Sequence, residues 1–407
     1  MREHWAEVAI QDVVQQVRRT VDVEEGGRYP LLGVRWYGNG AFLREVGVGG
    51  KIKAAKLYRV EVGDFIYNRL FAWKGSFSVI DEALSENFVS GEFPIFLTDR
   101  QRLLPEYLNL FMCQPSTWAQ IERESTGSTA TSRNRWKEGR FLEWRILLPP
   151  LIEQRRIVNL VHTVDAVQDA TSHTIDAHSE LAVRLVDNWV QGWNGPIARL
   201  GDIAKMGSGS GWKSSDEVSG SGDGRLRVLG ITNTPPGGVI TLDQVKYVEG
   251  LPKSTPKLSG SSLLMIRTNG NRTRIGNVYR IPLEARGCAF SAFQIGLHFG
   301  SPEEATFAYW MLSDSRVQSQ ISLAASGSTG LGNVAITWLR NLEIPWPDSE
   351  ASKIVISQLF DAAGECVIAG RSLQDKYVEL RSCLVSQLLS GGHGITASYD
   401  SILEMVS

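Results

Sequence analysis

The feature that most constrains how this 407-residue chain folds is an internal repeat with a period close to 200 residues. Leu32-Gly33-Val34 recurs as Leu229-Gly230-Ile231 at an offset of 197. The segments 125–129 and 325–329 both end in Gly-Ser-Thr, at an offset of 200. Solenoid repeats have periods of about 20 to 50 residues. A period this long indicates a duplicated domain instead.

Each copy has the same internal order. About 150 residues of short apolar runs separated by Gly, Ser and Pro come first, and about 40 residues without Pro follow. The first part is typical of a mixed α/β domain with short strands. Strands are predicted at Asp64–Asn68, Phe77–Ile80, Leu263–Arg267 and Gln294–Phe299, and helices at Pro105–Met112 and Glu303–Leu312.

The second part of each copy is predicted to be one long helix. Positions of coiled-coil spacing, three and four residues apart, run along both segments with a polar middle. A 40-residue helix is about 60 Å long, so each helix would act as a spacer. The predicted seam comprises Ile157, Leu160, Val164, Val167, Thr171, Thr174, His178, Leu181 and Leu185, and then Leu359, Ala362, Cys366, Ala369, Leu373, Tyr377, Leu380, Leu384 and Leu388.

These patterns divide the chain into five parts. We expect a first globular domain over residues 1–150, a central helix over 151–193 and a second globular domain over 194–349. A C-terminal helix over 350–392 and a flexible tail over 393–407 complete it. The fold class is therefore α+β, with two similar α/β domains in a pseudo-two-fold repeat.

Charge and cysteine content narrow the class of protein. Lys and Arg number 42 and Asp and Glu 44, so the chain as a whole is not a polyelectrolyte. By segment, the net charge is +1 over residues 1–150 and +3 over 194–349, but −3 in each helical part. A polyanion would therefore meet the globular domains. Four scattered cysteines, no signal peptide and no run of roughly 20 apolar residues predict a cytoplasmic protein without a membrane span.

None of the candidate catalytic motifs is complete in this sequence. The Gly-rich stretch 207–214 resembles a phosphate-binding loop, but Trp212 stands where such a loop needs glycine before Lys213, so a flexible loop is expected. The six histidines show no metal-ligand spacing, and the sequence has no G-x-S-x-G, dinucleotide or adenine-methyltransferase motif. We expect a binding or scaffolding protein, not an enzyme, with no cofactor and no metal.

Two polar, basic stretches suit nucleic-acid binding. Residues 123–140 interleave Arg and Lys with Ser, Thr and Asn, and Arg267–Arg274 is a basic loop with two asparagines. Such side chains supply phosphate contacts together with hydrogen bonds to base edges. The alternative, a solvated loop with surplus arginines, stays open for either stretch alone.

The motifs of both copies resemble the DNA specificity subunit of type I restriction-modification systems over nearly the whole chain. The resemblance rests on Gly63–Arg69, on Leu264–Gly270 and on the helix entrance 147–157, which has the form P-P-x-x-E-Q-x-x-I. The second entrance departs from it, with Glu350 kept and Ala351 in place of Gln.

The resemblance implies that each globular domain is a target-recognition domain that reads one half of a split site in double-stranded DNA. The two long helices would pack antiparallel and set the spacing. Such subunits have no catalysis of their own. They hold two methyltransferase subunits, which use S-adenosylmethionine, and through these the ATP-driven restriction subunits of a phage-defence complex.

On this basis two sets of site residues are expected. The helix-entrance set has a second interpretation, local helix capping, which is compatible with partner contact. The candidate DNA-binding residues are Arg35, Arg69, Lys74, Ser128, Arg133 and Arg135 in the first domain, and Lys213, Arg267, Asn269, Asn271, Arg272 and Ser328 in the second. The candidate partner-binding residues are Pro149, Pro150, Glu153, Gln154, Arg156, Glu350 and Lys353.

Two other classes of function stay open. One is an enzyme whose active site the motifs do not reveal. The other is a duplicated adaptor of another defence complex that does not read bases.

Overall fold

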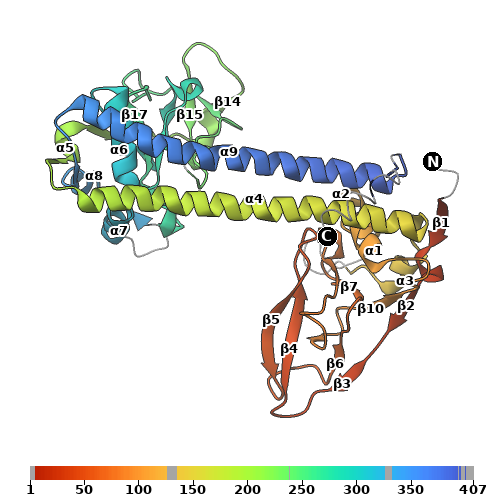
Figure 1. Cartoon of the computed structure of the whole chain (residues 1–407). Helices are drawn as coiled ribbons and strands as arrows, with labels where there is room; N and C mark the ends of the chain where they lie inside the picture. The colour runs from red at the N-terminus through yellow and green to blue at the C-terminus, as the bar shows by residue number, and fades with distance from the viewer. Residues whose placement is uncertain are drawn as a thin grey trace. The chain divides into compact units, whose positions relative to one another are not determined.

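In the computed structural model, the chain forms two compact units, each made of one globular domain and half of each of two long helices (Figure 1). Unit 1 comprises Met1–Thr171 and Leu373–Ser407, and unit 2 comprises Ser172–Ser372. The structure describes residues 5–125, 135–237, 239–325 and 332–392, together with 394, 395 and 399.

The domain of unit 1 combines small sheets with short helices. The strand pair β1 (Ala6–Ala9) and β11 (Arg145–Leu148) joins the two ends of the domain. A four-stranded sheet has the order β2 (Val14–Val17), β10 (Ile95–Thr98), β7 (Phe65–Tyr67), β8 (Phe77–Val79), and a five-stranded sheet the order β3 (Thr20–Asp22), β6 (Lys56–Arg59), β9 (Phe88–Val89), β4 (Arg28–Val34), β5 (Ala41–Val48). The helices are η1 (Ile10–Asp12), η2 (Ala72–Lys74), α1 (Pro105–Met112), α2 (Pro115–Glu124) and α3 (Glu138–Glu143).

The domain of unit 2 repeats this plan. Its two ends are joined by the strand pair β12 (Ile197–Arg199) and β23 (Glu343–Pro345). One four-stranded sheet has the order β13 (Lys205–Ser208), β21 (Gln294–His298), β17 (Ser262–Ile266), β19 (Val278–Arg280). A second has the order β14 (Glu217–Val218), β16 (Lys246–Glu249), β15 (Arg225–Leu229), β20 (Ala289–Phe290). A further pair joins β18 (Thr268–Asn269) to β22 (Gly332–Asn333). The helices are α5 (Leu200–Ile203), α6 (Pro302–Ser313), α7 (Ser315–Ala324), α8 (Ile336–Leu339) and the short η3 (Ser214–Asp216), η4 (Ile231–Asn233), η5 (Arg272–Arg274) and η6 (Leu283–Ala285).

The duplication predicted from the sequence is confirmed at the level of topology. The order β2-β10-β7-β8 in unit 1 corresponds to β13-β21-β17-β19 in unit 2, and α1 packs on β8 as α6 packs on β19. Both α1 and α6 begin with proline, which fits the first helical position because its missing N–H would be unpaired there anyway. The α+β class is therefore correct.

The core of each domain continues into the long helices α4 (Leu151–Gly192) and α9 (Glu350–Leu389). In unit 1, Phe96 and Phe141, with ring centroids 4.6 Å apart and the rings tilted to each other, belong to the same cluster as Val161 of α4. In unit 2, Phe307 of α6 belongs to the same cluster as Phe360 of α9. Each helix is therefore anchored in both units.

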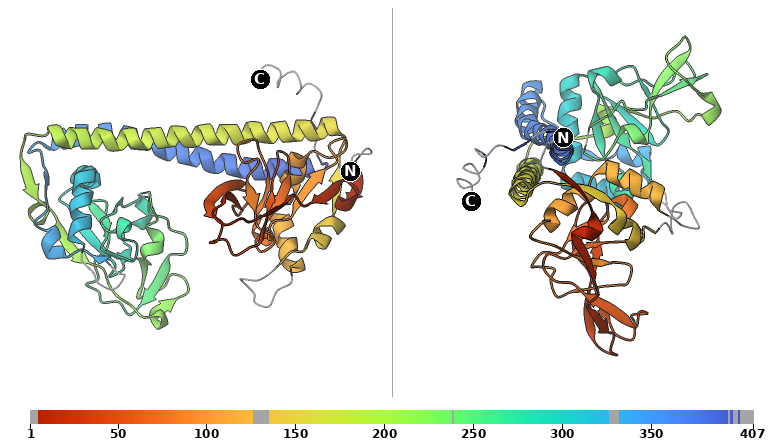
Figure 2. Two further views of the ribbon diagram at one scale, coloured as in Figure 1. Left: turned by 90° about the horizontal axis from the view of Figure 1, so that it is seen from below. Right: turned by 90° about the vertical axis from the view of Figure 1, so that its right-hand side faces the viewer.

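Within each unit, α4 and α9 lie side by side in opposite directions, but the predicted seam is wrong by a rotation of one residue (Figure 2). Val167 is 39% exposed, Leu181 57%, Leu373 45% and Leu380 53%. Of the predicted members, Ile157 and Leu388 are buried. The observed seam instead buries Gln154, Val158, Val161, Ile175, Ala182 and Val186 of α4, and Lys353, Ser357, Phe360, Val367, Val385 and Leu388 of α9.

The error has a physical cause. A spacing of three and four residues occurs on two neighbouring stripes of each helix, and the stripe that is buried contains polar residues. Within unit 1, Asp165 and Arg381 form a two-pronged ion pair across the helices, with Nη2 and Oδ2 3.0 Å apart. Within unit 2, a Cβ atom at Gly370 would lie 2.7 Å from Cγ1 of Ile175, so glycine permits the close approach.

Candidate nucleic-acid interface

Arg69 and Arg267 occupy equivalent positions in the two domains. The N–H of Arg69 donates to the carbonyl of Glu92 (3.0 Å), and the N–H of Trp136 donates to the carbonyl of Arg69 (3.1 Å). In unit 2, Arg267 donates to Phe293 (2.9 Å), and Val334 donates to Arg267 (3.1 Å). The same pair of backbone bonds therefore holds each arginine just after a central strand, β7 or β17.

The two arginines differ in what surrounds their charge. Arg69 forms an ion pair with Glu138, and the neighbouring Arg135 pairs with Glu92 at 2.5 Å. Arg267 donates from Nη1 to the hydroxyl of Ser208 (3.2 Å). Among the residues that the structure describes, no carboxylate lies within ion-pairing distance of Arg267. The charge of Arg267 is thus more available to a phosphate than that of Arg69.

Arg35 and Lys74 lie on two neighbouring segments of the first domain, the turn after β4 and η2. The turn after β4 is tied to η2 by hydrogen bonds from Tyr37 N–H to the carbonyl of Lys74 (2.6 Å) and from Gly38 N–H to that of Gly75 (2.9 Å). The Lys74 ammonium lies 3.8 Å from the ring centroid of Trp36. Arg35 stacks on Phe42 with its guanidinium carbon 4.4 Å from the ring centroid.

This surface also exposes aromatic rings that the sequence reasoning missed. Trp36 is 41% and Tyr37 60% exposed, and Tyr37 has a φ of 60°, which few non-glycine residues adopt. Gly75 has a φ of 69°, and a Cβ atom there would lie 2.3 Å from Trp118, so only glycine fits beneath this surface. Exposed aromatic rings next to cations are typical of surfaces that stack on or contact nucleic acid. Strand periodicity gives no signal for them, because they lie in a turn.

In the second domain, the side-chain oxygens of Asn269 and Asn271 accept hydrogen bonds from nearby backbone N–H groups. Asn269 Oδ1 accepts from the N–H of Asn271 (2.9 Å), and Asn271 Oδ1 accepts from the N–H of Thr273 (3.1 Å). A bidentate pairing with adenine needs both the oxygen and the nitrogen of the amide. Such pairing would first have to break these bonds. Arg272 lies next to them at the start of η5.

Lys213 lies at an exposed corner beside a surface pocket. The pocket, of about 310 Å³, is lined by Trp212, Ile231, Thr232 and Phe293 among others. Trp212 Nε1 donates to Glu217 Oε1 at 2.9 Å, which anchors the ring. Ser128, Arg133 and Ser328 lie outside the described residues.

At the helix entrances, three of the expected partner-binding residues, Pro149, Gln154 and Lys353, are buried. Gln154 is fully buried, and its Nε2 donates to the carbonyls of Arg102 (2.7 Å) and Pro149 (2.8 Å). Its Oε1 accepts from the N–H of Leu104 at the start of α1 (2.9 Å). The side chain of Gln154 therefore fastens α4 to α1.

Lys353 has the corresponding place in unit 2. It is 5% exposed, and its Nζ lies 3.3 Å from Glu304 Oε1 in the first turn of α6 and 4.2 Å from the ring centroid of Trp346. Lys353, rather than Ala351, thus corresponds to Gln154, which corrects the comparison of the two entrances made from the sequence. Pro149 is also buried, whereas Pro150 and Glu350 are exposed and Glu153 and Arg156 are half-buried.

Glu153 accepts a hydrogen bond from Trp5 Nε1 at 3.0 Å. This contact ties the start of α4 to the residue before β1. Glu153, Pro150, Arg156 and Glu350 are the members of the predicted set that a partner could reach.

The structure offers no assembled active site in the residues it describes. No group of three or more His, Cys, Asp or Glu side chains could hold a metal ion there. Ser262 Oγ and His298 Nδ1 are 2.8 Å apart, but Ser262 is 1% exposed and its hydroxyl already accepts from the N–H of Ser259. Burial lowers the pKa of His298 and raises the pKa of the Cys288 thiol. These groups suit a packed interior.

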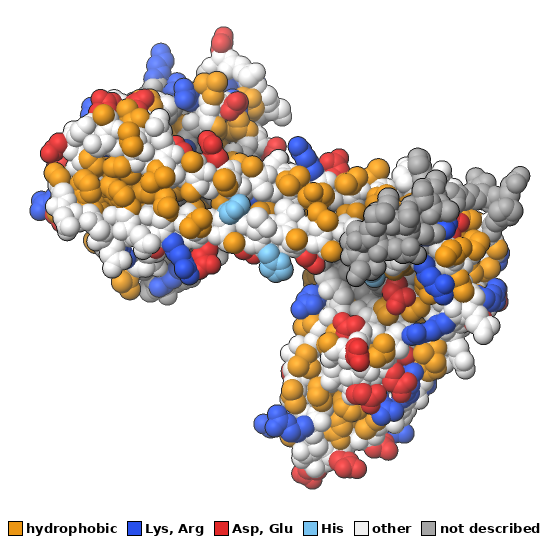
Figure 3. Space-filling model, viewed as in Figure 1, with side chains coloured by type: hydrophobic (Ala, Val, Ile, Leu, Met, Phe, Trp, Pro, Cys, Tyr) orange, Lys and Arg blue, Asp and Glu red, His pale blue; other side chains and the backbone are white. Residues whose placement is uncertain are grey.

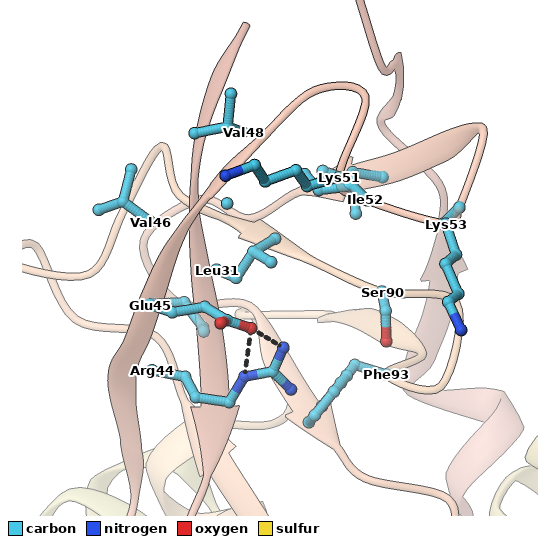
Figure 4. Close-up of a pocket in the computed structure, with 14 residues that line it drawn as sticks. Leu31, Arg44, Glu45, Val46, Val48, Lys51, Ile52, Lys53, Ser90 and Phe93 are labelled. Carbon is cyan, nitrogen blue, oxygen red and sulfur yellow. Dashed lines mark hydrogen bonds and ion pairs between the residues drawn. The ribbon is translucent and has the colours of Figure 1, made fainter. Parts of the chain in front are cut away.

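A hollow of about 490 Å³ opens beside β4 and β5 (Figure 4). Arg44 and Glu45 pair with each other, and Lys51 and Lys53 extend from the neighbouring loop. The residues that line it include no histidine or cysteine. None of the helices in the described parts of the chain is long and apolar enough to cross a membrane.

Comparison with known proteins identifies the fold. No protein-family model and no curated protein matches the sequence. A solved structure from work on complex assembly and conformational transition of the type I R-M system shares 15% identity, with a TM-score of 0.63, over 96% of this chain and 98% of its own. The type I restriction-modification S subunit from M. genitalium shares 13% identity, with a TM-score of 0.55, over 97% and 98%. The chain therefore has the fold of type I restriction-modification S subunits over nearly its whole length.

Proposed function

We propose that this chain is the DNA specificity subunit of a type I restriction-modification complex. Each globular domain reads one half of a split DNA site, and α4 and α9 set the distance between the two halves. The observation that carries the proposal is the pair of equivalent arginines, Arg69 and Arg267, held by the same backbone bonds in a chain of S-subunit fold. The two arginines are held by the same backbone hydrogen bonds but have different side-chain neighbours, which suits two half-sites of different sequence.

The partners of the complex supply the chemistry. Methyl transfer and ATP-driven cleavage belong to the methyltransferase and restriction subunits, and this chain contributes recognition and assembly. The net charge of −2 supports a division of labour in DNA binding as well, because affinity for DNA rests largely on phosphate neutralisation. This chain alone should bind DNA weakly.

The methyltransferase subunits dock on the outer faces of the long helices. Val355, Leu359, Cys366, Leu373 and Leu380 of α9 are all exposed and follow steps of four and then seven residues. This stripe has the spacing of a coiled-coil seam but faces away from α4, and hydrophobic side chains are visible among polar ones along the helices (Figure 3). A helix of a partner subunit would cover it.

The accessible residues at the helix entrances, Pro150, Glu153, Arg156 and Glu350, extend this surface. The internal repeat provides two related docking surfaces, so the complex contains two methyltransferase subunits for each copy of this chain.

An adaptor that does not read bases is the second candidate. It is favoured by the ion pairs of Arg69 and Arg135, which neutralise two cations of the first domain. Such an adaptor would form the same complex but would leave the DNA sequence unselected.

Co-expression with the methyltransferase of its own system tests both candidates. Native mass spectrometry should show a complex with two methyltransferase subunits, and methylome sequencing should show one bipartite methylated site. A complex that stops at one methyltransferase in excess partner, methyl transfer by this chain alone, or methylation without a defined sequence would contradict the proposal. Leu359→Ser with Leu373→Ser should weaken assembly, whereas Leu283→Ser, an exposed leucine of the second domain, is the matched control.

A further inference from the structure

Phe293 is an exposed aromatic residue whose backbone is fixed by hydrogen bonds. Its side chain is 51% exposed, yet its carbonyl accepts hydrogen bonds from the N–H groups of Arg267 (2.9 Å) and Thr268 (3.1 Å). It directly precedes β21, which pairs with both β13 and β17 inside the four-stranded sheet. A single exposed hydrophobic residue is ordinary in itself, so its meaning depends on its surroundings.

The pocket beside Phe293 offers mainly apolar contacts. It is lined by Phe293, Ala292, Trp212 and Ile231 together with polar residues, of which Lys246 pairs with Glu217 and Ser291 donates to Gln294. The buried Asn233 accepts from the N–H of Gly230 (2.9 Å) and donates to the carbonyls of residues 241 and 243 (3.1 Å each). A ligand therefore meets mainly rings and methyl groups there, together with the hydroxyl residues Ser210 and Thr232.

A cation lies next to this apolar surface. Arg267 donates to Ser208 Oγ, and Ser208 Oγ in turn lies 3.4 Å from the carbonyl oxygen of Ala292 at the pocket wall. The Nε of Arg267 is buried without a hydrogen-bond partner among the described residues. A guanidinium beside an apolar pocket complements the edge of a DNA duplex, where a backbone phosphate flanks the C5-methyl group of thymine in the major groove.

The equivalent position in the first domain has the opposite chemistry. Glu92 accepts from the N–H of Arg69 as Phe293 accepts from that of Arg267, but its carboxylate pairs with Arg135. The same backbone position therefore carries an acidic side chain in the first domain and an aromatic side chain in the second. A position that selects a base in each half-site requires this combination of fixed backbone and variable side chain.

We propose that Phe293 is a specificity-determining residue of the second domain and contacts the C5-methyl group of a thymine in its half-site. This inference rests on the proposed function. Ala292 and Thr232 line the same pocket and complete the contact with the methyl group.

The test uses the complete complex with its methyltransferase subunits and duplexes that carry the methylated site. Each thymine of both half-sites is replaced in turn by deoxyuridine, which lacks only the methyl group. One position in one half-site should lose affinity by about fourfold, the loss expected for a single buried methyl group. Phe293→Ala should lose a similar factor on the thymine duplex and become insensitive to deoxyuridine at that position.

Controls separate the possible failures. Phe293→Leu should keep part of the preference for thymine, and Leu283→Ala, which removes an exposed leucine outside the pocket, should change nothing. The inference is overturned if no thymine shows a methyl effect, if the half-sites contain no A·T pair, or if Phe293→Ala weakens all sequences alike. A wild-type complex that methylates no bipartite site would instead overturn the proposed function.

Discussion

The two domains share a scaffold but use their equivalent arginines differently. In the first domain Arg69 is paired with Glu138, and the exposed aromatic residues Trp36 and Tyr37 lie beside Lys74 instead. In the second domain Arg267 has a hydroxyl neighbour and lies beside the pocket of Phe293. After duplication, the backbone bonds around the arginine have been kept while the side chains that face outward have changed. The domains should therefore differ in how strongly each arginine contributes to binding.

The largest difference is expected for the buried polar residues at the two helix entrances. Gln154→Leu leaves one buried N–H and two carbonyls without their partner, so we expect a loss of about 2–4 kcal/mol in the stability of unit 1. Lys353→Met keeps the packing on Trp346, and the Glu304 carboxylate that it leaves is partly exposed and still accepts from the N–H of Gly300, so it should cost less, about 1 kcal/mol.

Hydrogen exchange reports the two units separately. Amides of α1 should lose protection in Gln154→Leu, those of α6 should hardly change in Lys353→Met, and Arg155→Leu at an exposed neighbour should leave α1 protected. Equal losses in both units would show that the two entrances are equivalent after all.

The next comparison concerns the arginines themselves. Arg267→Ala should weaken binding of the cognate site by the assembled complex by about 1–3 kcal/mol, whether it reads a base or a phosphate. Arg69→Ala should have a smaller effect, because its charge is already balanced by Glu138. Titrations at several salt concentrations measure both. If Arg69→Ala has the larger effect, Glu138 does not neutralise it in the complex. Arg44→Ala, on β5, is the matched loss of one cation in the first domain.

The smallest effect should come from removing the acidic partner. Glu138→Gln leaves Arg69 in place but frees its charge, so binding of DNA should tighten about twofold to threefold and its salt dependence should become steeper. Fluorescence anisotropy with cognate and unrelated duplexes measures the change. An unchanged salt dependence would mean that Arg69 does not approach a phosphate.

Much of the fold could be predicted from the sequence, because the duplication and the helical spacing both appear as patterns of residue positions. The strand after Gly63 and the helix from Pro105 lie where the apolar runs place them. The seam between the long helices could not be predicted in the correct register, because the inward-facing stripe includes the buried Gln154 and Lys353 and the half-buried Asp165, and so looks less apolar than the exposed one.

The candidate site was predicted only in part. Arg69 and Arg267 stand out as the ends of repeated strands, but the partner of Arg69 lies 69 residues away in the sequence, at Glu138. Phe293 gives no sequence signal, because an aromatic residue before a strand is usually part of the core. Its exposure follows from tertiary structure alone.

The ion pair between Asp165 and Arg381 has a consequence for how such a protein can evolve. Sliding one helix along the other by a heptad would separate these two half-buried charges and leave both in a mainly apolar seam, which is costly. The ion pair therefore fixes the register of the two helices against each other. Under the proposed function, substitutions on their outer faces are expected to accumulate as partner subunits change, while the separation of the two DNA half-sites is expected to stay constant.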